Sequence, residues 1–367
     1  MSDAHREFLP LPKQVELNEW PELSYRFGLT DGLPTFPPER SVVESLVAGS
    51  GRGGDELVGR IPPRGGLATV EAVAANAAMA GCLPEYMPVV LAAIEAALVP
   101  AFNLAGVVTT THPCWPLVIV SGRIVRDLGM ATEESLFSGG GARANLAIGR
   151  AIRLVLWNLA GAYPREPVQE IMGHPGRLAF FIAEDSAESP WATLPESRGL
   201  TGAESAVTVF ACEGPQIANL WGVETADEHT VGERWLELVA DQMCARGNSN
   251  THTMGEILVV LSPSMARRLS AEGWSRSRVQ TFLWETARRR LGDIRVRADG
   301  TPATDTSAHY AWWPDWVDQS DPDFRVPVTA SPEAIHLVVS GADSIPCAAV
   351  CPSWGHLGGF ASSRAID

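Results

Sequence analysis

The chain has 367 residues, of which 46% are hydrophobic and 19% are charged, and its formal net charge at pH 7 is −15. This combination predicts a compact globular protein with one large domain or two, because disordered chains pair low hydrophobicity with high charge. The negative charge argues against nucleic acid and anionic membranes as partners, since proteins bind both mainly through Lys and Arg.

The apolar segments and the cysteines predict a soluble, cytoplasmic protein. Residues 1–20 lack the basic start and apolar run of a secretory signal. The apolar run at 87–102 contains Glu95 and is too short for a membrane helix. The cysteines are spread thinly along a long chain, which predicts reduced thiols rather than a disulfide framework.

The first 60 residues are rich in proline, glycine and charge, which predicts an extended N-terminal arm. Thr69 is suited to cap a helix that continues to residue 79 and ends near Gly81. Apolar residues at helical spacing predict a second helix over 85–98.

The rest of the chain alternates strands with helices. Strands are predicted over 104–110, 117–120, 178–183, 207–212, 257–261, 294–296 and 335–339, and helices over 142–159, 231–245, 264–271 and 276–290. This alternation predicts an α/β fold with layered, mixed or mostly parallel sheets flanked by helices, in two α/β halves. We expect an α/β domain over 61–200 and a second over 201–367, without an internal sequence repeat.

The run Gly139–Gly140–Gly141 precedes a predicted helix and is the strongest chemical signal in the sequence. Glycines let backbone N–H groups converge on an anion at a helix start, and Arg143 and Arg150 follow on that helix. The run matches neither the Walker A motif nor the dinucleotide fingerprint. It therefore predicts a site for a small carboxylate or phosphate, the alternative being a flexible turn with surface arginines.

Three more polar residues are predicted to bind the same anion. Asn145 lies between the two arginines, Arg177 precedes a predicted strand, and Glu184 follows that strand. Polar residues that flank a buried strand are often placed at the edge of the sheet where α/β proteins bind ligands.

The segment around His112 and Cys114 lies between two predicted strands, where α/β proteins commonly place substrate loops. A reactive thiolate needs a neighbouring cation or helix N-terminus, and His112 is a candidate base for Cys114 or for Cys82. His174, beside Arg177, completes the predicted catalytic set. For each cysteine the alternative is a small buried hydrophobic residue.

A metal site is the alternative reading of these side chains. His112 and Cys114 are suitable donors, as are His252, Cys347, Cys351 and His356. The spacing of Cys347 and Cys351 gives only one pair, without the second half of a zinc motif. We predict no resident metal, and the sequence identifies no cofactor.

Four separated blocks resemble the bacterial family of UGSC (seleno)proteins and their unfused relatives. The blocks are PRGGLATVE at 63–71, MAGCLPEY at 79–86, RANLAIGR at 143–150 and GHPG at 173–176, and the resemblance covers about residues 60–360. Some relatives carry a further domain with a Sec- or Cys-Gly-Ser-Cys motif, which implies thiol or selenol chemistry there. This chain lacks that motif, so only Cys82, the block from Arg143 to Arg150 and His174 carry over.

Three hypotheses for function follow. The first is a thiol-assisted lyase, transferase or reductase that acts on a small anionic metabolite, with Cys82 as nucleophile or redox thiol and His112 as base. The second is a metal-dependent hydratase or lyase that uses His112 and Cys114. The third is a non-catalytic subunit for a separate Gly-Ser-Cys-type partner protein. Helices rich in small residues favour a homodimer.

Overall fold

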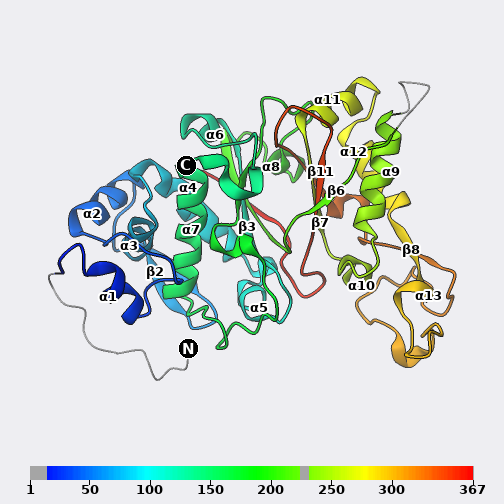
Figure 1. Cartoon of the computed structure of the whole chain (residues 1–367), viewed down its shortest axis with the longest axis horizontal. Coiled ribbons are helices and arrows are strands. Elements are labelled where there is room, and N and C mark those ends of the chain that lie inside the picture. The colour runs from blue at the N-terminus through cyan, green and yellow to red at the C-terminus, as the bar shows by residue number, and fades with distance from the viewer. Residues whose placement is uncertain (1–14, 224–230, 367) are drawn as a thin grey trace.

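The computed structural model describes residues 15–223 and 231–366. Its centre consists of two four-stranded mixed sheets, with the strand orders β12-β5-β3-β4 and β10-β7-β11-β6. Helices flank both sheets, as Figure 1 shows. The predicted α/β class is therefore confirmed.

The first sheet is formed by β3 (Trp115–Gly122), β4 (Phe181–Ala183), β5 (Ser205–Cys212) and β12 (Ser362–Ala365). Strand β3 runs parallel to β4 and antiparallel to β5, and β12 is antiparallel to β5. Helices α4 (Met87–Ala97) and α7 (Arg143–Asn158) cover this sheet, and α3 (Val70–Ala80) packs on α7. Nearly every residue of β3 is buried, which is typical of a strand that is covered on both faces.

The second sheet is formed by β6 (Gln216–Ala218), β7 (Ile257–Leu261), β10 (Ile335–Val339) and β11 (Ala348–Pro352). Strand β7 runs parallel to β10 and antiparallel to β11, and β6 is antiparallel to β11. Helices α9 (Val231–Met243) and α12 (Arg276–Thr286) pack on its outer face, with α11 (Pro263–Ala271) beside α9.

The two sheets share one topology, although the sequence shows no repeat. In each, a central strand has a parallel neighbour on one side and an antiparallel neighbour on the other, and the outermost strand is antiparallel to that second neighbour. The two sheets exchange their outermost strands. After β5 of the first sheet the chain forms β6 at the edge of the second, and after β11 of the second sheet it forms β12 at the edge of the first. The halves are thus joined by two crossing connections, and the predicted boundary at residue 200 precedes β5, which belongs to the first sheet.

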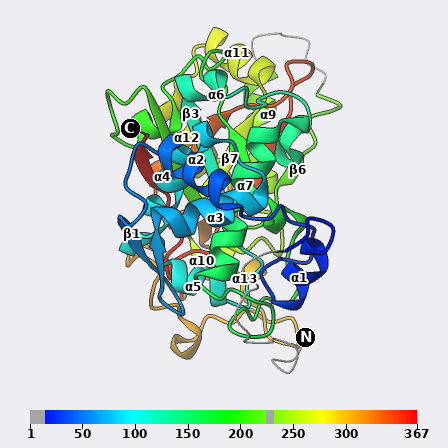
Figure 2. The same cartoon turned by 90° about the vertical axis from the view of Figure 1, so that its left-hand side faces the viewer.

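The two sheets also share hydrophobic core. Leu258 and Val260 of β7 pack into the core of the first half, whereas Ile257, Val259 and Leu261 pack beneath α9 and α12. This alternation is what the two-residue period of a strand requires. Figure 2 shows the first half in front of the second, with α6 and α11 at one end of the sheets and α5 and α10 at the other.

Backbone hydrogen bonds join the sheets at both of these ends. The amide of Asp185, just after β4, donates to the carbonyl of Val339 in β10 at 2.9 Å. At the opposite end the amide of Glu213, just after β5, donates to the carbonyl of Pro352 in β11, also at 2.9 Å. The second junction positions the candidate site.

Shorter elements complete the described chain. They are α1 (Trp20–Arg26), α2 (Arg40–Gly49), β1 (Leu57–Ile61), β2 (Gly66–Thr69), η2 (Pro84–Tyr86), η3 (Pro100–Phe102), α5 (Leu104–Thr109), α6 (Arg123–Asp127), η4 (Leu136–Gly141), η5 (Pro175–Leu178), α8 (Leu194–Ser197), α10 (Asn250–Thr253), β8 (Arg288–Arg290), α13 (Leu291–Ile294), η7 (Thr306–Ala308), β9 (Arg325–Pro327) and η8 (Pro332–Ala334).

Four predictions of local structure are wrong. The arm predicted over residues 1–60 is not extended in its described part, 15–60, because α1 and α2 bury Trp20 and Leu46 in the fold; residues 1–14 lie outside the described residues. Residues 104–109 form helix α5 rather than a strand, Ile294 ends helix α13 where a strand was predicted, and residues 288–290 form strand β8 rather than the end of a helix. The helix cap at Thr69 is confirmed, since its side chain accepts a hydrogen bond from the amide of Ala72.

In the described ranges 15–223 and 231–366, no single helix is long and apolar enough to cross a membrane. One bent pair, Pro84–Ala97 with Pro100–Thr109, passes by length and composition alone.

Candidate active site at the junction of the two halves

Four polar side chains gather where β5 and β11 end. His112 lies in the loop between α5 and β3, and Glu213 follows β5 directly. His174 immediately precedes η5, and Ser249 immediately precedes α10, a helix of the second half. The site is therefore built from both halves, at the end of the sheets marked by α5 and α10 in Figure 1.

Glu213 is the centre of this group. Its Oε1 atom lies 2.9 Å from Nε2 of His112, at an angle too oblique for a hydrogen bond. The hydroxyl of Ser249 donates to the same carboxylate oxygen at 2.5 Å. The side chains of His112 and Glu213 are 25% and 18% exposed, although Nε2 of His112 is itself buried.

His174 packs beside Glu213 with its ring largely buried. Within the described part of the chain neither ring nitrogen has a hydrogen-bond partner, and the ring meets Phe180 edge to face at 4.8 Å. A Cβ atom added to Gly214 would lie 3.4 Å from Cβ of His174, so the backbone after Glu213 runs against this side chain. Burial lowers the pKa of His174 to about 4, although the carboxylate of Glu213 opposes the shift. The ring is therefore neutral at pH 7, and both of its nitrogens are buried without a hydrogen-bond partner among the described residues.

Arg177 supplies a positive charge near Cys114, and its backbone amide donates to the carbonyl of His174 at 3.2 Å. Its guanidinium lies 4.0 Å from the centre of the Trp115 ring and forms an ion pair with the buried carboxylate of Glu170. Burial and the neighbouring Arg153 lower the pKa of Arg177 to about 9. The side chain remains a cation at neutral pH, held between an indole ring and a single carboxylate.

No family model matches this chain, and no curated protein matches it. The chemical roles of the site residues are therefore inferred from the geometry of the site alone.

The predicted thiols are close to basic residues but are not ionised. Cys114 lies near Arg177, and Cys82 lies beside Arg143 and donates to the carbonyl of Ala147 at 3.4 Å. Burial raises the pKa of each thiol to about 12. Both stay protonated at neutral pH, which is the opposite of what a nucleophilic cysteine requires.

Of the predicted catalytic residues, His112 and His174 lie beside Glu213, and Cys114 lies near both Glu213 and Arg177. The structure does not bring Cys82 to them, because the contacts of Cys82 are with α7. Cys212 lies beside Cys351 and near Cys114 in the buried centre, and burial together with the hydrogen bond to Cys351 raises the pKa of Cys212.

The expected anion clamp at the glycine run is not assembled. The guanidinium of Arg143 donates to the carbonyl of Gly81 at 2.8 and 3.0 Å. Arg150 pairs with Asp31 at 3.0 Å and donates to the carbonyl of Pro34. These two arginines hold the segments that contain Gly81 and residues 31–34 against α7, because their guanidinium groups donate to carbonyl or carboxylate oxygens in those segments.

The glycines themselves form a tight turn. Gly139, Gly140 and Gly141 have φ values of 82°, 54° and 77°, which residues other than glycine rarely adopt. Asn145 fastens the preceding loop by accepting from the amide and donating to the carbonyl of Ala131. The predicted residues around this turn therefore have structural contacts and lie outside the histidine cluster.

Glu184 lies at the opposite end of the sheets from the histidines. Its carboxylate accepts a hydrogen bond from Ser121 at 2.6 Å and bonds from the amide of Leu194 at 3.0 and 3.1 Å. Burial raises its pKa to about 7, although these hydrogen bonds oppose the shift. Glu184 therefore links the end of β4 to β3 and α8 through hydrogen bonds, and it does not face Arg177.

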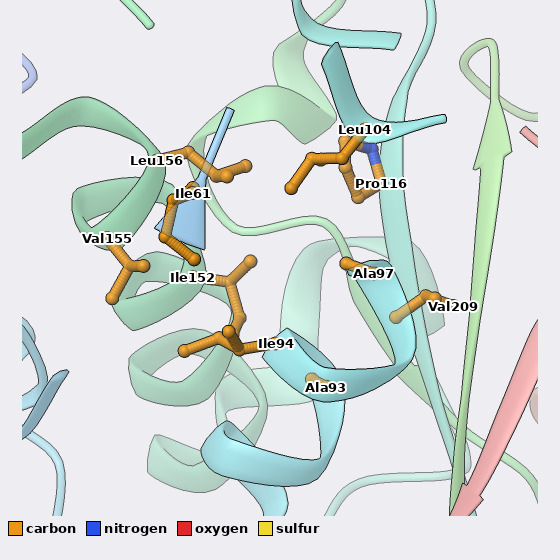
Figure 3. A pocket seen from close by; sticks show the side chains of 10 residues that line it. All are labelled: Ile61, Ala93, Ile94, Ala97, Leu104, Pro116, Ile152, Val155, Leu156 and Val209. Atoms are coloured by element: carbon orange, nitrogen blue, oxygen red, sulfur yellow. The ribbon is translucent and has the colours of Figure 1, made fainter. Parts of the chain in front are cut away.

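Two other kinds of ligand site are not formed. Across residues 15–223 and 231–366, no three His, Cys, Asp or Glu side chains gather closely enough to hold a metal ion. The cavity in Figure 3 is lined by aliphatic side chains, among them Ile94, Ile152 and Val209, and has a volume of about 10 Å³. A space of this size holds at most one water molecule, so the cavity is a packing defect.

Sequence reasoning missed Glu213, and it noted Ser249 only as part of a polar loop over 248–253 that could orient substrate. Glu213 directly follows the predicted strand 207–212, and a carboxylate that follows a buried strand is a usable signal. Nothing in the sequence indicates that residue 213 meets residue 112, because that contact depends on the pairing of β5 with β3.

Proposed function

We propose that this protein is an acid–base enzyme that transfers protons on a small carboxylate- or phosphate-bearing substrate. One observation carries the proposal: a neutral histidine and a second histidine lie beside the same carboxylate, that of Glu213, at the junction of the halves, and the guanidinium of Arg177 lies near the adjoining Cys114. Pairs of titratable groups with contrasting environments are typical of acid–base sites.

The side chains have complementary roles in this proposal. His174 accepts a proton from a carbon next to the substrate's acid group, and the electron pair of that C–H bond is left on the substrate. His112, oriented by Glu213, returns a proton to the substrate, either to carbon in an isomerisation or to a departing oxygen in an elimination. Arg177 binds the substrate anion in competition with Glu170. Cys114 contributes packing, because its thiol is protonated.

Solvent deuterium exchange tests the proposal, because it detects proton transfer whatever product is formed. The purified protein is incubated in D₂O with a mixture of small hydroxy-, keto- and amino-carboxylates, and loss of C–H signals is followed by proton NMR. We expect exchange in at least one compound, with its rate reduced about 10² to 10⁴-fold by His174→Asn and by Glu213→Gln, the range for loss of a general base.

A matched control is His309→Gln, which removes a histidine outside the site and should leave the rate unchanged. Exchange that survives both His174→Asn and Glu213→Gln would overturn the proposal. So would exchange that falls equally in the control.

A second function, as a subunit that needs a protein partner, is favoured by two apolar side chains beside the site. Ile171 and Met172 are 77% and 88% exposed, and the amide of Ile171 donates to the carbonyl of Thr111, next to His112. Exposed apolar residues at a site's edge are typical of a protein interface. Absence of exchange by the chain alone, restored by a co-purified thiol or selenol protein, would support this function and the resemblance to UGSC proteins.

A further inference from the structure

A second pocket lies between the two halves, at the opposite end of the sheets from His112. Its volume is about 680 Å³, which is in the range of sites for small organic ligands. Val260 of β7 and Ala349 of β11 form its floor, and Phe137 of η4 lines it from the first half. A ligand in this pocket would contact both halves.

The mouth of the pocket is apolar on one side. Ile217 and Ile345 line it and are 59% and 51% exposed. Large aliphatic side chains that stay exposed around a concavity mark a surface suited to an apolar ligand body. The floor and this part of the mouth therefore favour a ring or alkyl chain over a fully polar molecule.

The other side of the mouth carries negative charge. Glu133 and Glu134 line the pocket, both are exposed, and neither has an ion pair with any residue that the structure describes. No Lys, Arg or His is among the described residues that line it. Glu133 and Glu134 also line the adjoining hollow that contains Gly140 and Gly141, so the charge there is opposite to the one an anion needs.

The hydroxyl groups in the pocket suit a cationic ligand. Ser262 and Ser340 are 4% and 2% exposed at the carboxyl ends of β7 and β10, and both line the pocket. Their hydroxyls already donate to carbonyl groups, Ser340 to Ala183 at 2.7 Å and Ser262 to Ile345 at 3.2 Å. The hydroxyl oxygen of Ser340 retains lone pairs that can accept from an ammonium group, whereas that of Ser262 already accepts from the amide of Cys347 at 3.0 Å.

We propose that this pocket between the two sheets binds a small organic cation, an ammonium group carried on an aromatic or alkyl body. The body occupies the space between Phe137 and Val260, and the ammonium lies toward Glu133 and Glu134. The formal charge of −15 raises the local concentration of such a ligand further. This site is separate from the proposed acid–base site and does not depend on it.

Isothermal titration calorimetry with three matched probes tests the proposal: 4-phenylbutylamine, the neutral 4-phenylbutanol and the anionic 4-phenylbutyrate. At low ionic strength we expect the amine to bind about tenfold more tightly than the alcohol, and the carboxylate to bind more weakly than either. The double variant Glu133→Gln, Glu134→Gln should bind amine and alcohol equally.

The control variant Glu16→Gln, Glu19→Gln removes the same two charges from an exposed segment outside the pocket. It should keep the preference for the amine. Equal binding of amine and alcohol by the unmodified protein, no binding of any probe, or equal loss of the preference in both double variants would each overturn the proposal.

Discussion

Replacing Glu184 with Gln is expected to change how the stability of the protein depends on pH. Burial raises the pKa of this carboxyl from an ordinary 4.5 to about 7 in the folded chain. The folded protein therefore holds the proton more tightly than the unfolded chain does. The stability from this site is complete below the unfolded pKa and is lost as the pH rises through about 7.

The size of this loss follows from the two pKa values. Between pH 5 and pH 8.5 the buried carboxyl lowers the free energy of unfolding by about 2.5 kcal/mol. Glutamine has nearly the same shape, keeps an acceptor for Ser121 and Leu194, and has no charge to lose. The variant should therefore gain about 2.5 kcal/mol relative to the unmodified protein over this pH range.

Urea denaturation of both proteins at pH 5 and pH 8.5 measures this gain. Because all other titrating groups are common to the two proteins, their contributions cancel in the difference. A difference in unfolding free energy that stays the same at both pH values would show that Glu184 is ionised in the fold and would refute the reasoning.

Three further predictions concern packing. Gly66→Ala should destabilise the fold by about 2 kcal/mol, because the added Cβ would lie 2.2 Å from the carbonyl oxygen of Leu159; an unchanged melting temperature would contradict this. Asn145→Asp should destabilise by about 2 kcal/mol in urea denaturation, since a carboxylate cannot donate to the carbonyl of Ala131, whereas stability equal to that of the unmodified protein would contradict that role. Iodoacetamide followed by peptide mass analysis should modify Cys347 first, because the other cysteines are buried; faster modification of any of them would contradict the packing.

Much of the fold was predictable because many of its elements have strong local signals. The apolar runs at 257–261 and 335–339 form strands β7 and β10 with the predicted bounds. Helix α3 begins after its cap at Thr69 and ends at Gly81, as predicted. A side-chain cap and a left-handed glycine are properties of the local chain, so the sequence alone indicates them.

The failures come from tertiary contacts. Residues 104–109 are rich in apolar and β-branched residues, yet Asn103 caps them as a helix by accepting from the amide of Gly106. Trp354 packs so closely on Gly106 that a Cβ there would lie 2.3 Å from the indole ring. A contact with a residue so distant in the sequence cannot be read from local periodicity.

The candidate site was predictable in part for the same reason. The sequence singled out His112 and His174, and the structure places both beside Glu213, whereas Arg177 lies near Cys114. It also singled out Arg143 and Arg150, whose guanidinium groups are engaged by backbone carbonyls of residues 81 and 34. Residue type indicates which side chains have useful chemistry, whereas their partners are set by the fold.

Titration of the histidine ring signals by NMR tests the proposed acid–base site most directly. We predict that the ring of His174 stays neutral from pH 8.5 down to pH 5 and takes up its proton near pH 4, because burial lowers its pKa to about 4. We also predict that an anion bound at the site shifts the signals of His174 and His112 together. A His174 ring that titrates near 6.5 like a histidine in water, and does not respond to that anion, would contradict the account.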